Sequence, residues 1–487
     1  MDKNFFDKMN YYHRCIELQS TPVAVYERLY TGEKNSFVYE SLEESERRGR
    51  YSFLGGKPYL LVTARKGDIE VVCHDKKINM KGNPFTLIRE YLSQIKFFAE
   101  VKPFPGGALG YVSYDGIRYF EDIPDKNYDE IDVYDLYFMF PGEIIIFDHK
   151  ENIINIVIYS DSDATVRMDS LVNTIHSDPV ESTLEPESQT NRDVDFSSNL
   201  SKSEFENIVK QAKKYIVQGD IFQVVLSQRL SFPVKKNPLD VYKTLRKTNP
   251  SPYMYYLDID VCSVLGSSPE ILVKCCEDEV VSRPLAGTRP RGQDQTEDLL
   301  YEQELKNDDK ERAEHVMLVD LARNDLGRVC KSGSVQTTDF LEVERFSRVM
   351  HLVSHVQGEL KDSCDSIDLL RATFPAGTVS GAPKIRAMEI IDELEPERRG
   401  IYSGAIGYLG FDGDMDMCIA IRMMVIKEKV GYIQAGAGIV ADSIPENEYY
   451  ETLNKARALL QAVTGKKEVT VQGRKQSVSK SYVGKVE

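Results

Sequence analysis

Short apolar runs separated by turn residues recur through most of this 487-residue chain. Before residue 160 they include FVYES, RYSFLGG, PYLLVTA, DIEVVC and EIIIFD, each with the length and composition of a strand. In that part only residues 83–97 show the apolar spacing that predicts a helix. Later in the chain, further runs alternate with helical segments. The pattern predicts an α+β fold in which large antiparallel β-sheets pack together with helices on the outside.

One stretch differs from the rest of the chain in composition. Residues 177–203 are polar, acidic and almost free of aromatic side chains, which is typical of a linker. We therefore expect an N-terminal region at 1–176 and a C-terminal region at 204–465. The last residues, 466–487, lean basic and predict a flexible tail.

The formal net charge of −16 disfavours nucleic acids and anionic membranes as partners, because both require a basic surface. The chain has no run of eighteen apolar residues and no apolar segment near its first residue, so we expect a cytoplasmic location. Its eight cysteines are scattered and include no C-x-x-C pair, which argues against a zinc or dithiol site. Neither of the common phosphate-binding glycine motifs follows a strand-like run.

Two predicted helices each carry a pair of glutamates three residues apart. Glu311 and Glu314 lie in the helix predicted for residues 310–328, and Glu448 and Glu451 follow Pro445 near the start of the last helix. Two such helices that meet in a cleft would offer an all-oxygen site for Mg²⁺. The alternative, two unrelated exposed pairs, is equally compatible with the spacing. Zinc is a poor alternative because no cysteine or histidine pair joins the glutamates.

Four further features have both a functional and a structural interpretation. Residues 375–383 form a glycine-bearing loop before a helix, which suits an anion but is also a good helix start. Residues 436–438, Gly-Ala-Gly, allow either a ligand or a packed backbone to approach closely. Arg422 lies in an apolar run and needs a carboxylate, from the protein or from a ligand. His351 also lies in an apolar run, and a lone histidine in such a run is more often a core residue than a catalyst.

A set of motifs runs in one order from residue 219 to residue 452: GDIFQVVLSQR, NPSPYM, GSSPE, RPLAGTRPRG, KERAEHVMLVDLARNDLGRV, VMHLVS, FPAGTVSGAPKIRAM, RRGIYSGAIGY, AIRMMV, AGAGIVADS and PENEYYET. In order and spacing, this set resembles the chorismate-utilising enzymes. Within them the chain is most similar to the anthranilate synthase component I proteins. The resemblance implies two large antiparallel β-sheets with outer helices.

The resemblance also implies a Mg²⁺-dependent reaction of chorismate with ammonia, through aminodeoxyisochorismate, to anthranilate and pyruvate, the first step of tryptophan biosynthesis. It implies that Glu314 and Glu451 bind the metal, supported by Glu311 and Glu448. Glu311 would also protonate the leaving hydroxyl group. The other implied catalytic residues are Gln223, His351, for the elimination step, and Thr378. The implied substrate contacts are Gly287, Thr288, Tyr402, Arg422, Ala437, Gly438 and Lys455.

Two positions distinguish this chain from other members of the resembling family. Ala286 stands where aminodeoxychorismate synthases have a lysine nucleophile, and Gln223 stands where isochorismate and salicylate synthases have a lysine that activates water. Both residues favour ammonia as the nucleophile and anthranilate as the product. A non-catalytic, amino-acid-sensing scaffold subunit is the alternative of another class, but it would have no use for four glutamates in one cleft.

The front half resembles segments that bind tryptophan as a feedback inhibitor, which gives region 1–176 a regulatory role. The implied inhibitor residues are Glu40, Ser41, Arg50, Pro252, Tyr253 and Met254. Glu40 would meet the ammonium group of the amino acid, although all six residues could instead be packing residues between sheets. No cysteine nucleophile of a glutamine amidotransferase is present, so ammonia would come from a separate glutaminase subunit.

Overall fold

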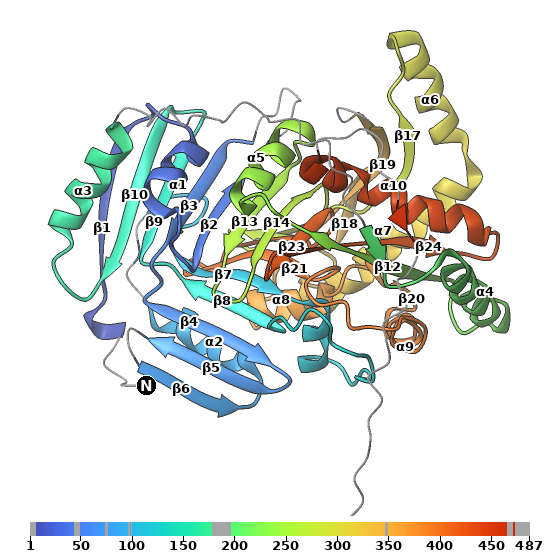
Figure 1. Cartoon of the computed structure of the whole chain (residues 1–487), viewed down its shortest axis with the longest axis horizontal. Coiled ribbons are helices and arrows are strands. Elements are labelled where there is room, and N and C mark those ends of the chain that lie inside the picture. The colour runs from blue at the N-terminus through green and yellow to red at the C-terminus, as the bar shows by residue number, and fades with distance from the viewer. Residues whose placement is uncertain are drawn as a thin grey trace, which may run out of the picture.

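The computed structural model describes residues 6–42, 49–73, 76–95, 98, 100–177, 196–345, 349–464 and 471–472. In this part of the chain, two large β-sheets pack against each other and helices cover their outer faces (Figure 1). This architecture confirms the predicted α+β fold. The main hydrophobic core lies between the sheets, where Phe53 of one sheet and Tyr408 of the other have ring centroids 5.6 Å apart.

The larger sheet, sheet A, has 13 strands. Across the sheet they follow the order β1 (Asn10–Glu17), β10 (Ile153–Ser160), β9 (Glu143–Asp148), β3 (Tyr51–Gly56), β2 (Ser36–Glu40), β13 (Tyr253–Asp258), β14 (Ser263–Ser268), β23 (Met423–Lys427), β24 (Val430–Ile439), β12 (Gln223–Pro233), β11 (Phe196–Ser198) and β25 (Val471–Gln472). β20 (Gly381–Ala382) also pairs with β12. The pairs are antiparallel except β11 with β25, which is parallel.

The second sheet, sheet B, has 12 strands. Their order is β17 (Leu285–Pro290), β19 (Val349–Glu359), β16 (Glu279–Ser282), β15 (Ile271–Cys276), β22 (Met415–Ile419), β21 (Ala405–Gly410), β7 (Gly107–Val112), β8 (Leu136–Phe140), β4 (Leu60–Arg65), β5 (Asp68–Cys73) and β6 (Lys76–Lys81). β18 (Gln336–Arg345) pairs with β19 beside this path.

Each sheet contains strands from both the N-terminal and the C-terminal region. In sheet A, β2 pairs with β13, so that Glu40 lies opposite Met254. In sheet B, β7 pairs with β21, so that Gly107 lies opposite Gly410. The two regions on either side of residues 177–203 are therefore stretches of sequence that build the same sheets together.

The helices of the described part are α1 (Pro22–Tyr30), α2 (Pro84–Gln94), α3 (Thr165–His176), α4 (Lys202–Gln218), α5 (Pro238–Thr248), α6 (Gln295–Asn307), α7 (Asp309–Val329), α8 (Ser366–Thr373), α9 (Lys384–Leu394) and α10 (Pro445–Thr464). Three 3₁₀ helices join them: η1 (Phe6–Lys8), η2 (Tyr114–Tyr119) and η3 (Gly377–Val379). A second core lies between sheet A and the helices α1, α3, α5 and α10. No described helix has the length and apolar character needed to cross a membrane.

Three parts of the fold differ from the sequence predictions. α1 was not predicted, although Thr21 caps it and Pro22 occupies its first turn. Most of the predicted linker, residues 178–195, lies outside the described residues. Its last part is structured: it contains β11 and the capping box in which Ser201 begins α4. Of the predicted flexible tail, only residues 471–472 are described, and they form β25.

A buried arginine connects several of these elements. Arg399 follows α9, and its guanidinium donates to both carboxylate oxygens of Glu395 at 2.9 and 2.6 Å. It also donates to the carbonyl oxygens of Val225 in β12, at 2.6 Å, and of Val379 in η3, at 2.7 Å. The Glu395 carboxylate in turn accepts from the backbone N–H and the hydroxyl of Ser227. The Arg399–Glu395 pair thereby attaches β12 and η3 to the end of α9.

Replacing Arg399 by methionine is expected to lower the free energy of unfolding by about 3–5 kcal/mol, because it leaves the buried Glu395 carboxylate without its counter-charge. Urea unfolding followed by circular dichroism measures this loss. Arg14→Met is the matched control. Arg14 pairs with Asp169 at the surface, where the side chains are 40% and 56% exposed, so its loss should cost less than about 1 kcal/mol. Equal losses in the two variants would contradict the structural role of Arg399.

Candidate active site

A cavity of about 590 Å³ lies between α7, α10 and strands β12, β17, β19 and β24. α7 packs against β17 and β19, and α10 packs on β24, so residues far apart in the sequence meet at this cavity. The predicted site residues that line it are Gln223, Gly287, Thr288, Glu311, Glu314, His351, Thr378, Tyr402, Arg422, Gly438, Glu448, Glu451 and Lys455. We call it the catalytic cavity.

The structure does not bring Ala437 to the catalytic cavity. Successive residues of a strand face opposite sides of a sheet. Gly436 and Gly438 of β24 therefore border the cavity, whereas Ala437 is fully buried in the main core. A methyl group at Gly438 would lie 2.6 Å from Nε2 of Gln223, and one at Gly436 would lie 2.9 Å from the hydroxyl of Tyr402. Both glycines thus leave room for side chains at the cavity floor.

The four predicted glutamates line this one cavity from two helices. Asp308 caps α7 by accepting from the N–H groups of Lys310 and Glu311, and this fixes the start of the helix that carries Glu311 and Glu314. Gln223 donates to Oε1 of Glu314 at 3.0 Å. Burial, and then the charge of Glu311, raise the pKa of the Glu314 carboxyl.

On α10, burial raises the pKa of the Glu448 carboxyl, and a hydrogen bond from Ser443 partly offsets the rise. Glu451 is more exposed than Glu448 and forms an ion pair with Lys455, at 2.6 Å. Lys455 also donates to the carbonyl oxygen of Gly436 at 2.9 Å. On this side of the cavity, Glu451 is therefore paired with a cation. Glu448 has no cationic partner within ion-pair distance among the described residues.

The donor set fits Mg²⁺, which prefers carboxylate oxygens and keeps several water ligands. The raised pKa values of Glu314 and Glu448 mean that their charged forms are disfavoured, and a divalent cation would reverse this. As placed, no three His, Cys, Asp or Glu side chains of the described residues converge closely enough to hold a metal ion. Gln223 and Lys455 contact Oε1 of Glu314 and of Glu451, respectively, and these two glutamate side chains would have to move closer to share one ion.

Arg422 lies at one wall of the catalytic cavity, in the segment between β22 and β23. It was predicted to lie within a strand, but its φ of +49° places it in a turn conformation instead. Its Nη1 donates to the carbonyl oxygen of Lys455 at 2.9 Å, and no described carboxylate lies within ion-pair distance. Burial lowers the pKa of the guanidinium. A half-buried cation of this kind at a cavity wall favours an anionic ligand.

His351 of β19 also borders the cavity, so it is not the core histidine that its apolar surroundings suggested. Its Nδ1 lies 2.7 Å from the carbonyl oxygen of Gly287 and 3.2 Å from the hydroxyl of Thr288. A carbonyl oxygen can only accept, so Nδ1 carries the proton and Nε2 is the basic nitrogen. Burial lowers the pKa of His351, which keeps the ring neutral.

Glu270 is a cavity residue to which the sequence analysis gave no role. It follows β14 in the motif GSSPE, is only 8% exposed, and lines the cavity together with Thr378. Burial raises the pKa of its carboxyl to about 7, and Thr378, Lys455 and Arg422 partly oppose the rise. Of the carboxyl groups that line the cavity, Glu270 is therefore the one best suited to carry a proton near neutral pH. A glutamate directly after a strand of small residues was the available signal.

The model of a protein family described as chorismate binding enzyme matches residues 34–461. The chain belongs to this family. Its curated relatives include the anthranilate synthase component 1 of Aquifex aeolicus, 47% identical over 457 residues, which cover 91% of this chain and 92% of the relative. The protein of the same name from Acetivibrio thermocellus is 43% identical, again over 91% and 92% of the two chains. These relatives confirm the resemblance predicted from the motifs.

Solved structures of the chorismate binding enzyme family share this fold. Anthranilate synthase component I from Streptococcus pneumoniae TIGR4 matches with a TM-score of 0.77 at 40% identity, over 91% of this chain and 98% of that one. The menaquinone-specific isochorismate synthase of Escherichia coli matches with a TM-score of 0.70 over 93% and 94% of the chains. Its identity of 19% makes this a likeness of fold alone.

A second large cavity, of about 410 Å³, contains most of the residues expected to bind an inhibitor. Glu40, Ser41, Arg50, Pro252 and Tyr253 line it, together with Tyr39, Tyr51, Phe53 and Asp416. We call it the regulatory cavity. Pro269 and Leu285 line both cavities, so they form a shared wall between them.

One inhibitor prediction needs correction, and a second residue has a partner that the sequence did not reveal. Met254 does not line the regulatory cavity, because it alternates with Tyr253 along β13 and is buried in the second core. Glu40 lines the cavity, but Arg246 donates to both of its carboxylate oxygens at 2.7 and 2.9 Å, and Tyr242 donates at 2.7 Å. Glu40 is thus already paired within the protein, and its contact with a ligand ammonium group stays a prediction. Asp416, which accepts from Tyr253 at 2.9 Å and lies 3.4 Å from the ammonium group of Lys274, is a further carboxylate at this cavity.

Glu270→Gln is expected to stabilise the fold above pH 7 and to leave it unchanged at pH 4. The carboxyl has a higher pKa in the folded protein, about 7, than in the unfolded chain, so its contribution is fully present at low pH and is lost as the pH rises to about 7. One pKa unit corresponds to about 1.4 kcal/mol, so the gain at pH 8 is about 3 kcal/mol at most. Urea unfolding at both pH values measures this gain in the free energy of unfolding.

Glu304→Gln, at an exposed position, is the control for this prediction. A gain that is the same at pH 4 and pH 8 would contradict the burial of a protonated Glu270.

Proposed function

We propose that this chain is the component I subunit of an anthranilate synthase, which converts chorismate and ammonia to anthranilate and pyruvate. The observation that carries the proposal is the meeting of four glutamates from α7 and α10 in a cavity that also holds the half-buried Arg422. The name shared by its relatives at 42–47% identity supports the same reaction. Gln223 and Ala286 both line the catalytic cavity, so neither position offers the lysine expected of the aminodeoxychorismate, isochorismate or salicylate synthases.

In this proposal Glu314 and Glu451 hold Mg²⁺, with Glu311 and Glu448 beside them. A cation held there would offset the negative charge of the ring carboxylate of chorismate and so assist departure of the hydroxyl group at C4. Arg422 takes the second carboxylate of the substrate, and the Tyr402 and Thr288 hydroxyls and the backbone of Gly287 and Gly438 contact the rest. Lys455, which pairs with Glu451 at 2.6 Å, would add positive charge near the anionic substrate.

Gln223 positions the ammonia. Its Nε2 donates to Glu314, while its Oε1 is buried and has no hydrogen-bond partner among the described residues. A buried amide oxygen without a donor is costly, and an ammonia N–H would satisfy it. Ammonia held there attacks C2 of the ring, next to the carbon that bears the carboxylate. Thr378 borders the same space and orients the substrate beside Glu270.

Two proton transfers accompany the reaction. Glu270, whose pKa is raised to about 7, gives its proton to the hydroxyl at C4, which leaves as water. The sequence resemblance implied Glu311 for this role, but Glu311 is paired with the guanidinium of Arg289, 3.4 Å away. In the elimination step, Nε2 of His351 is the base that removes the proton from C2 as pyruvate departs.

The remaining parts of the proposal concern supply, control and location. Ammonia comes from a separate glutaminase subunit, and the enzyme acts in the cytoplasm, with no nucleic acid or membrane as partner. Region 1–176 is regulatory, region 177–203 is a linker, region 204–465 is catalytic and region 466–487 is a basic tail.

Tryptophan binds in the regulatory cavity, where Tyr39, Phe53 and Tyr253 offer aromatic surface for its ring.

Incubation of the purified chain with chorismate, MgCl₂ and ammonium chloride tests the main proposal. Anthranilate, detected by its fluorescence, is the expected product. A 4-aminobenzoate precursor or isochorismate would move the function to a relative in the same family. If a folded chain made no product of any kind, the enzyme proposal would fail and the scaffold alternative would replace it.

Glu314→Gln and Glu451→Gln should each abolish Mg²⁺-dependent turnover, because each removes a charged oxygen ligand without changing the shape of the side chain. Both variants should also lose Mg²⁺ binding in calorimetry while keeping the melting temperature of the parent chain. Glu446→Gln is the matched control, since Glu446 lies on α10 but pairs with Lys202 outside the catalytic cavity. Near-normal turnover in both test variants would refute the metal assignment.

Tryptophan should inhibit the reaction and raise the melting temperature of the chain. Binding to the folded state alone stabilises it by about 2.7 kcal/mol at a ligand concentration of 100 times Kd. Asp416→Asn should weaken both effects if the amino group of tryptophan lies near Asp416. Thermal unfolding with tryptophan or with glycine as control gives the measurement. An unchanged melting temperature at millimolar tryptophan would rule out the regulatory assignment.

A further inference from the structure

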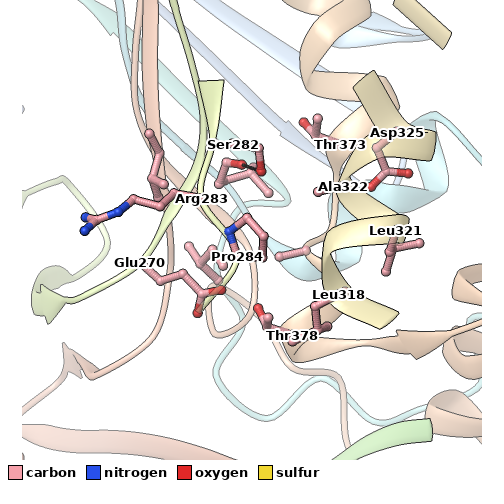
Figure 2. A pocket seen from close by; sticks show the side chains of 15 residues that line it. Glu270, Ser282, Arg283, Pro284, Leu318, Leu321, Ala322, Asp325, Thr373 and Thr378 are labelled. Atoms are coloured by element: carbon pink, nitrogen blue, oxygen red, sulfur yellow. Dashed lines mark hydrogen bonds between the residues drawn. The ribbon is translucent and has the colours of Figure 1, made fainter. Parts of the chain in front are cut away.

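A small cavity of about 40 Å³ lies behind Glu270, between α7, the turn from β16 to β17 and the segment from α8 to η3 (Figure 2). We call it the rear cavity. Glu270, Leu318 and Thr378 line both the rear cavity and the catalytic cavity, so the two adjoin at these residues. One water molecule needs about 10–15 Å³ of such space, so the rear cavity is large enough for two or three.

Asp325 of α7 lines the rear cavity away from Glu270 and is only 5% exposed. Lys384 donates to its Oδ2 at 2.8 Å and to the carbonyl oxygen of Thr373 at 3.2 Å. The other oxygen, Oδ1, is buried and has no hydrogen-bond partner among the described residues. An unsatisfied buried polar atom costs about 1–3 kcal/mol, and water in the adjoining space removes that cost.

The lining of the rear cavity is suited to a short row of water molecules. In Figure 2, Asp325 and Thr373 stand together on one side, and Glu270 and Thr378 stand on another, with Pro284 and Ala322 between them. Ser282 also lines the cavity, but its hydroxyl donates to the carbonyl oxygen of Leu272. Water in such a space bonds to the carboxyl and hydroxyl groups and to other water molecules, and the apolar side chains offer no competing partner.

Glu270 needs a source of protons that does not pass through the catalytic cavity. In the proposed mechanism it loses a proton in every cycle, and a bound substrate covers it on that side. Burial raises the pKa of both Glu270 and Asp325, although the charge of Lys384 opposes the rise at Asp325. Both groups can thus carry a proton at a higher pH than an exposed carboxyl group.

We propose that water molecules in the rear cavity return a proton from Asp325 to Glu270, which makes Asp325 a positioning residue of the reaction. The Glu270 carboxylate, having given its proton to the departing hydroxyl group, takes one from the nearest water. That water takes one from its neighbour, the Asp325 carboxyl supplies the last, and solvent reprotonates Asp325. This inference rests on the proposed function and on the acid role of Glu270.

The test compares Asp325→Asn and Ala322→Leu with the parent chain. Asparagine keeps the size of the side chain but cannot pass on an acidic proton, and leucine at Ala322 fills the rear cavity that this residue lines. Asp320→Asn and Ala313→Leu make the same changes at exposed positions of α7 and are the matched controls. Turnover is measured with chorismate, MgCl₂ and saturating ammonium chloride from pH 6 to pH 9, in H₂O and in D₂O.

Both test variants should lower kcat about tenfold or more, within the range by which general acid catalysis contributes. KM for chorismate should stay within about twofold of the parent value. The loss should grow toward pH 9, where protons are scarce, and the solvent isotope effect should rise. The charged groups that face the two carboxyl groups and shape this profile are Arg328, Lys384, Arg422 and Lys455.

Several results would overturn the relay. An unchanged kcat in either folded test variant would do so, as would a loss that is equal at all pH values and follows a fall in melting temperature. If Asp325→Asn does not fold, because Lys384 loses its carboxyl partner, the comparison of Ala322→Leu with Ala313→Leu decides. If the parent chain itself makes no anthranilate, the proposed function fails before the variants are compared, so the two failures are distinguishable.

Discussion

The buried pair of Arg399 and Glu395 is the interaction on which the catalytic cavity most depends. Its hydrogen bonds reach β12 at Val225 and Ser227, and η3 at Val379. Gln223 begins β12, Thr378 lies within η3, and Tyr402 follows Arg399 by three residues. One ion pair therefore sets the relative positions of three cavity side chains from separate parts of the chain. A buried pair with all its hydrogen bonds made gives little net stability, but it specifies one arrangement, because no other placement of these charges satisfies them.

The catalytic cavity holds an excess of carboxyl groups in a chain whose net charge is already −16. A dianionic substrate can enter only if some of this charge is neutralised. Three means are available: a proton on Glu270, the cation proposed above between α7 and α10, and the basic groups Lys310, Arg422 and Lys455 that line the cavity. The three are linked, because Lys455 pairs with Glu451, which is also a proposed ligand of the cation. Substrate, metal and proton are thus expected to bind with mutual dependence.

The sequence predicted the features that depend on local spacing. Helical periodicity identified α7 and α10 and placed each glutamate pair on one face, and the ordered motifs pointed to the family. It could not predict contacts between distant segments. Glu40 is neutralised by Arg246, 206 residues away, and Ala437 and Met254 turn away from their cavities because the exposed face of a strand depends on the whole sheet. Glu270 was missed for the same reason, since only the folded chain shows how deeply it is buried.

The sharing of both sheets between the two halves of the chain affects how the protein is made. β7 can pair with β8 early, but its other edge, where Gly107 lies opposite Gly410, has no partner until β21 has been synthesised. At about 5–20 residues per second, a ribosome takes on the order of 15–60 s to cover that interval. During this time the early strands of both sheets present open edges, which can pair with other chains. Correct assembly of this protein is therefore exposed to aggregation during translation, and a chaperone that covers strand edges would be of most use in that interval.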